Sequence, residues 1–115
     1  MPLIKLETTA ALDDLEQRTL CGKLSRLAAE VIGKPEQYVQ AIVQGGLTML
    51  HGGAAGPAAF VDVRSIGGLS PAVNRTLTER ICGLLANLGI PSERVYLNFT
   101  DVSPSAWGHD GATFG

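Results

Sequence analysis

The sequence predicts an α/β fold of the α+β kind, in which two consecutive β-α-β units share one four-stranded mixed sheet with both helices on one face. Strand-like apolar runs alternate with two long helical periods. A short motif also recurs once in each half of the chain. The length of 115 residues suits a single domain, residues 1–115, and leaves no room for a third layer.

The first unit begins almost at the start of the chain. Residues Pro2–Glu7 form an apolar, strand-like run. From Leu12 onward, apolar residues recur at helical spacing and acidic residues occupy the first turn, which predicts a helix that ends at Gly33. After a turn, the alternating segment Tyr38–Val43 predicts the second strand.

The second unit repeats this plan. Residues 58–63 read as a strand, Ser70 and Pro71 mark a helix start, and the helical period ends at Gly89. Residues 95–99 close the unit as a strand. The motif Gly-x-Pro-x-x-x-Val begins at Gly33 and again at Gly89. We interpret the match as an internal duplication.

Two right-handed crossovers place both helices on one face of the sheet and leave the other face bare. We expect Ile42, Phe60 and Tyr96 on the bare face, and Val95, Leu97 and Phe99 toward the helices. An apolar face without a third layer needs another copy of the chain, so a homo-oligomer is predicted. The tail, residues 101–115, is long enough to add a short edge strand to a neighbour.

Composition and charge exclude several classes of protein. The chain has 9 Lys and Arg against 11 Asp and Glu and no basic run, so we expect no nucleic-acid partner and no membrane partner. No apolar stretch approaches the ~20 residues that cross a bilayer. The first 20 residues also lack the layout of a signal peptide. A cytoplasmic location is therefore expected.

The possible metal ligands and glycine-rich segments give no site. Cys21, Cys82, His51 and His109 are scattered, with no ligand spacing on one element, so we expect no metal and read both cysteines as buried thiols. The glycines at 52, 53 and 56 lack the ending of a phosphate-binding loop, and we read them as turns.

Pro2 is the most informative residue for chemistry. Initiator methionine is normally removed before a small residue, so the mature chain would begin with the secondary amine of Pro2. Terminal amines titrate at about pH 7.7–8.0, and burial near cations lowers that pKa, which would leave a neutral base at pH 7. The alternative is that Pro2 is only a tolerated residue at the start of a strand.

Several motifs in fixed order resemble the macrophage migration inhibitory factor family of the tautomerase superfamily. They are Met1-Pro2, Gly33-Lys34-Pro35, Ser65-Ile66-Gly67, Asn74-Arg75, Cys82-Gly83-Leu84-Leu85, Arg94-Val95-Tyr96-Leu97-Asn98 and Thr113-Phe114. The resemblance implies a homotrimer of duplicated β-α-β chains. It also implies a cofactor-free isomerase that catalyses keto-enol tautomerisation of phenylpyruvate-like or dopachrome-like carboxylates, which are small aromatic keto or enol acids.

The resemblance also assigns roles by position. Pro2 would be the general base, and Lys34 and the backbone N–H of Ile66, with Ser65 beside it, would bind the substrate carboxylate. Tyr96 and Asn98 would reach the site across the subunit boundary. Without the resemblance, Lys34 reads as a solvated lysine after a helix, and residues 65–66 read as a strand end entering a turn. Asn98 then reads as a hydrogen-bonding residue of an interface.

Two departures from the family pattern bear on function. Residues 58–61 lack the CxxC of better-known members, so thiol-disulfide exchange is not expected there. The tail reads Ala106-Trp107-Gly108-His109, with Trp107 before the usual tryptophan position, so Trp107 is expected to line the substrate slot and narrow it. The alternative function is a cytokine-like trimer that binds a protein receptor through a vestigial site, with secretion that uses no signal peptide.

Overall fold

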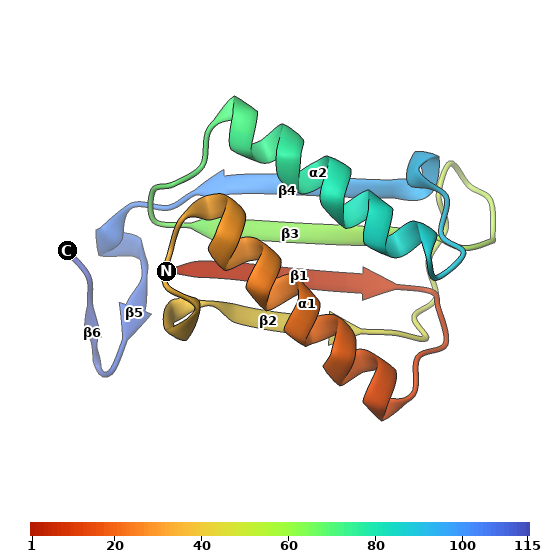
Figure 1. Ribbon diagram of the computed structural model, residues 1–115, viewed down its shortest axis with the longest axis horizontal. Coiled ribbons are helices and arrows are strands. Elements are labelled where there is room, and N and C mark those ends of the chain that lie inside the picture. The colour runs from red at the N-terminus through yellow and green to blue at the C-terminus, as the bar shows by residue number, and fades with distance from the viewer.

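The computed structural model describes residues 1–115 as one sheet covered on one face by two helices (Figure 1). The sheet contains β1 (Pro2–Thr8), β2 (Gln40–Gln44), β3 (Ala59–Ser65) and β4 (Val95–Asp101). The helices are α1 (Asp14–Ile32) and α2 (Pro71–Ala86). Short 3-10 turns η1 (Glu36–Tyr38), η2 (Ser92–Arg94) and η3 (Pro104–Ala106) lie between elements, and the tail holds β5 (Gly108–His109) and β6 (Ala112–Thr113).

The order of strands in the sheet is β2-β1-β3-β4. Strand β1 is parallel to β2, β3 is parallel to β4, and the two central strands β1 and β3 are antiparallel. Each parallel pair is joined by one helix, so each half of the chain is a β-α-β unit. The predicted mixed sheet with two helices on one face is confirmed.

Capping residues set where the helices begin. The Asp13 side chain accepts a hydrogen bond from the Glu16 N–H while the Glu16 carboxylate accepts one from the Asp13 N–H, which forms a capping box. Helix α1 therefore begins at Asp14, two residues after the predicted start at Leu12. Ser70 caps α2 by accepting from the Val73 N–H, as the sequence predicts.

The duplication predicted from the repeated motif is visible in the backbone. Gly33 and Gly89 both adopt left-handed conformations, with φ of 79° and 78°. A proline and a 3-10 turn follow each of them, η1 in the first unit and η2 in the second. Tyr38 lies in η1 because its N–H donates to the Pro35 carbonyl at 3.0 Å. The prediction that strand β2 starts at Tyr38 is therefore wrong, and β2 starts at Gln40.

The core lies between the sheet and the helices. Fully buried side chains of β1 and β3 pack against fully buried residues of α1 and α2: Ile4, Leu6, Val61, Val63, Leu24, Leu77, Ile81 and Leu85. Val95, Leu97 and Phe99 pack on this core, as predicted. On the other face Ile42 is 39% exposed and Tyr96 67% exposed. Neither helix is both long and apolar enough to cross a membrane.

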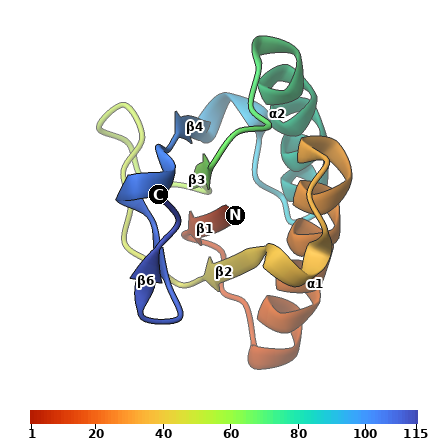
Figure 2. The same ribbon diagram turned by 90° about the vertical axis from the view of Figure 1, so that its left-hand side faces the viewer.

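The tail forms a hairpin of its own. Asp110 and Gly111 both have positive φ, 51° and 80°, as in the tight turns that match the twist of paired strands. They bring β5 and β6 into antiparallel pairing. In Figure 2 this hairpin lies on the side of the sheet away from the helices. The sequence prediction of a single edge strand missed this turn.

Candidate functional site

A cavity of about 460 Å³ opens where β1 begins. Its ten lining residues come from the chain start, from η1 with the start of β2, and from the tail: Met1, Pro2, Gln37, Tyr38, Val39, Gln40, Trp107, Gly108, His109 and Phe114. The volume is in the range of small-molecule sites. The cavity brings together Pro2 and Trp107, both of which were selected from the sequence.

Pro2 is the first residue of β1 and pairs with Ser65 of β3. It is fully buried in this structure, in which Met1 precedes it. The terminal amine belongs to Met1, and burial first, then the positive charge of Lys34, lower the pKa of that amine. This end of β1 therefore favours a neutral amine.

The turn after β3 lies beside the chain start. The Ile66 N–H donates to the Met1 carbonyl at 3.4 Å. The Ser65 hydroxyl is buried and donates to the Gly67 carbonyl at 2.6 Å, so it fixes the turn and does not line the cavity. The Gly67 N–H donates to the Asp101 carboxylate at 3.1 Å, which ties the turn to the end of β4.

Lys34 reaches this turn from the end of α1. Its Nζ lies 3.8 Å from the place where a Cβ would stand at position 67. Gly67 and Gly68 have φ of 72° and 82°, and a Cβ at Gly68 would come within 2.7 Å of the Ile32 side chain. Both positions therefore require glycine. Lys34 is half-buried and does not line the cavity while Met1 is present.

Tyr96 and Asn98 are not near Pro2 in the same chain. Within the sheet they pair with Phe60 and Asp62 of β3, whereas Pro2 pairs with Ser65 at the far end of that strand. The Tyr96 ring packs on His51, with ring centroids 4.7 Å apart. The Asn98 carbonyl oxygen accepts from the Thr100 hydroxyl at 3.3 Å. Both side chains are exposed on the face of the sheet that the helices do not cover.

Sequence reasoning missed most of the cavity wall. Gln37, Tyr38, Gln40 and Phe114 were not selected, and His109 was considered only as a metal ligand and as part of the departure from the family pattern. A signal existed for the first three, because Leu3 pairs with Gln40 in parallel register and any turn leading into β2 must lie beside Pro2. For His109 and Phe114 the signal was the Asp110-Gly111 pair, which is typical of a tight turn and indicates that the tail folds back as a hairpin.

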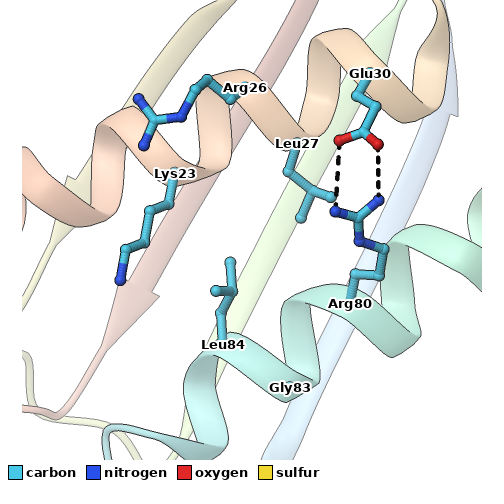
Figure 3. Close-up of a pocket in the computed structure, with 7 residues that line it drawn as sticks. All are labelled: Lys23, Arg26, Leu27, Glu30, Arg80, Gly83 and Leu84. Carbon is cyan, nitrogen blue, oxygen red and sulfur yellow. Dashed lines mark hydrogen bonds and ion pairs between the residues drawn. The ribbon is translucent and has the colours of Figure 1, made fainter.

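A second cavity, of about 450 Å³, lies between the helices on the outer face (Figure 3). Leu27 and Leu84 point toward each other across it, and an ion pair joins Arg80 to Glu30 at 3.4 Å. Its charged side chains are Lys23, Arg26, Glu30 and Arg80, and it contains none of the residues that the sequence selects for the site. We therefore locate the candidate site at Pro2.

The whole chain is similar to proteins of one known family. A family model described as macrophage migration inhibitory factor matches residues 1–115. A macrophage migration inhibitory factor homolog of Brugia malayi is 37% identical over 116 residues, covering 100% of both chains. The solved structure of the homologue from Prochlorococcus marinus has a TM-score of 0.90 at 38% identity, covering 98% of this chain and 99% of its own. A macrophage migration inhibitory factor-like protein from Entamoeba histolytica gives 0.91 at 32% identity, covering 98% of each chain. The chain belongs to the macrophage migration inhibitory factor family.

Proposed function

We propose that this protein is a cofactor-free keto-enol tautomerase of phenylpyruvate-like or dopachrome-like carboxylates, with Pro2 as general base. One observation carries the proposal. Pro2 lines a cavity of about 460 Å³ at a place where burial and Lys34 lower the pKa of the terminal amine. Proton transfer at a substrate carbon requires a base beside a space that holds the substrate, and a neutral amine in this cavity provides both.

The reaction needs only one proton carrier. In the enol-to-keto direction, the neutral Pro2 amine takes the proton of the enol hydroxyl, and the resulting ammonium delivers it to the carbon next to the carbonyl. In the reverse direction, the neutral Pro2 nitrogen removes a proton from that carbon, and the resulting ammonium gives it to the carbonyl oxygen. Lys34 and the Ile66 N–H hold the substrate carboxylate and offset the negative charge that develops.

Removal of Met1 would expose two groups together. The nitrogen of Pro2 is an amide while Met1 is attached, and an amide nitrogen is not a base. The Ile66 N–H is occupied by the Met1 carbonyl at 3.4 Å. In the proposed complex, an oxygen of the substrate carboxylate would replace the Met1 carbonyl oxygen as the acceptor of this hydrogen bond. Processing thus creates the base and frees the donor in one step.

The proposed active assembly is a homotrimer. Ile42 and Tyr96 leave apolar surface on the uncovered face of the sheet, and the chain has no further layer to cover it. Tyr96 lies near the opposite end of the sheet from Pro2, and Asn98 lies at the middle of β4, so each would join the site of a neighbouring copy. Each site would then contain residues of two subunits.

The test is turnover of enol phenylpyruvate by protein whose intact mass shows that Met1 is absent. A matched sample with Met1 retained has the same side chains and no terminal amine on Pro2. The proposal expects activity only in the first sample. Inactivity of both would favour the alternative, a cytokine-like trimer that binds a protein receptor through a vestigial site.

A further inference from the structure

The cavity at Pro2 has four polar side chains in its wall. Gln37, Tyr38 and Gln40 come from η1 and the start of β2, and His109 comes from β5. None of the four side chains makes a hydrogen bond or ion pair with the rest of the chain. No Asp or Glu lines the cavity. The wall therefore offers hydrogen-bond donors that no other residue of the chain engages, and no carboxylate that would repel an anion.

The second β-α-β unit provides an internal comparison. Arg94 occupies in η2 the position that Tyr38 occupies in η1. The Arg94 guanidinium donates to the carbonyls of Pro57 at 2.6 Å and Ala54 at 2.9 Å, both in the loop that precedes β3. In the second unit, the loop before β3 thus fills the space beside η2 and accepts the hydrogen bonds of Arg94. In the first unit, the corresponding space beside η1 is the open cavity, and its polar side chains are available to a ligand.

His109 is held with its ring face covered. Its imidazole stacks on Phe114, with ring centroids 5.8 Å apart and planes inclined by 7°. The Phe114 N–H donates to the Trp107 carbonyl at 3.1 Å, which secures the far strand of the hairpin. Both rings line the cavity. A ring stacked by its face keeps its nitrogens at the free edge, where an imidazole donates and an imidazolium donates twice.

We infer that His109 determines specificity in this site, and that the preferred substrate is an α-keto acid with a second carboxylate at the end remote from the keto group. The inference rests on the proposed function. Lys34 and the Ile66 N–H take the first carboxylate, and His109, supported by the amides of Gln37 and Gln40, takes the second. A site built to hydrogen-bond a polar group discriminates strongly against an analogue that lacks it.

The probes are the enol forms of 4-carboxyphenylpyruvate and 4-methylphenylpyruvate, which are similar in shape and differ in charge. For protein without Met1, we expect kcat/KM for the carboxylate to exceed that for the methyl compound by about tenfold or more, as for one charge-assisted hydrogen bond. His109→Phe keeps the stacking surface and should bring the ratio to about one. Gln40→Leu should lower the ratio, whereas Gln44→Leu, on the same strand outside the cavity, should leave it unchanged.

The outcomes separate the two proposals. A ratio near one in the parent protein, or a high ratio that survives His109→Phe, would overturn the inference while leaving the tautomerase assignment in place. Loss of turnover on both probes in protein verified to lack Met1 would overturn the proposed function and this inference with it. A high ratio that falls toward one in His109→Phe, because kcat/KM drops more for the carboxylate than for the methyl compound, supports both.

Discussion

Lys34 and Ile90 occupy the same place in the two β-α-β units, each directly after a glycine that ends a helix in left-handed conformation. Ile90 is completely buried in the core, whereas Lys34 is only half-buried and its charge lowers the pKa of the terminal amine. The duplication therefore produced one unit with an ordinary core residue and one with a cation beside the chain start. We expect one site per chain for that reason.

Lys34→Gln should move the pH profile. A general base acts when neutral, so kcat/KM should rise with pH through the pKa of the Pro2 amine, which we expect below the 7.7–8.0 of ordinary terminal amines. For the Met1 amine at the same end of β1, Lys34 is the second cause of the lowered pKa, after burial. Replacing it should raise the pKa and shift the rising limb to higher pH, still short of an unburied amine. If the rising limb of the pH profile did not shift, Lys34 would not affect the pKa of the amine.

Lys34→Ala should weaken binding of carboxylate substrates. Loss of a charge-assisted contact is expected to raise KM by about ten- to hundredfold, with a smaller effect on kcat. Methyl esters of the same substrates carry no negative charge, so their kinetic constants should change little. An equal rise in KM for the acids and for their methyl esters would show that Lys34 does not bind the substrate carboxylate.

Trp107→Val tests the size of the cavity. Trp107 is half-buried and lines the cavity wall with Pro2. Because its indole narrows the space for an aromatic ring, the smaller side chain should raise turnover of enol phenylpyruvate above that of the parent. A drop in turnover, with the thermal midpoint unchanged, would instead make Trp107 part of the ring-binding surface.

A single charged substitution on the uncovered face of the sheet tests the oligomeric state. Ile42 lies on the uncovered face of the sheet and is 39% exposed in the single chain. We expect light scattering to give a trimer for the parent and a monomer for Ile42→Asp, because an unpaired carboxylate is costly in an apolar interface. Glu16→Gln, a surface change at the cap of α1, should remain a trimer. A parent protein of monomer mass at micromolar concentration would contradict the proposed assembly.

Local signals predicted the elements more accurately than they predicted the site. The spacing of apolar residues, the Ser70 cap and the repeated Gly-x-Pro motif each depend on neighbours in sequence, and the structure confirms both helices and all four strands of the sheet. The wall of the cavity depends on packing between segments remote in sequence. Pro2 and Phe114 lie at opposite ends of the chain, and they line one cavity because the tail folds back on its Asp110-Gly111 turn.

The boundaries that were missed also have local causes. The Pro35 carbonyl holds Tyr38 in a 3-10 turn, although its side chain fits the alternating pattern of the strand that follows. The capping box of Asp13 and Glu16 starts α1 after Leu12, which continues the apolar period but precedes the cap. In both places a specific hydrogen bond overrides the hydrophobic pattern.

The most direct measurement is kcat/KM of Pro2→Gly for enol phenylpyruvate, with removal of Met1 verified by intact mass in variant and parent. Glycine leaves a terminal amine but loses the secondary amine and its fixed φ. Loss of a general base costs about a hundred- to ten-thousandfold, so we expect a substantial loss of activity toward that range while the fold and oligomer remain intact. Full activity of Pro2→Gly in protein shown to lack Met1 would contradict the assignment of Pro2 as the base.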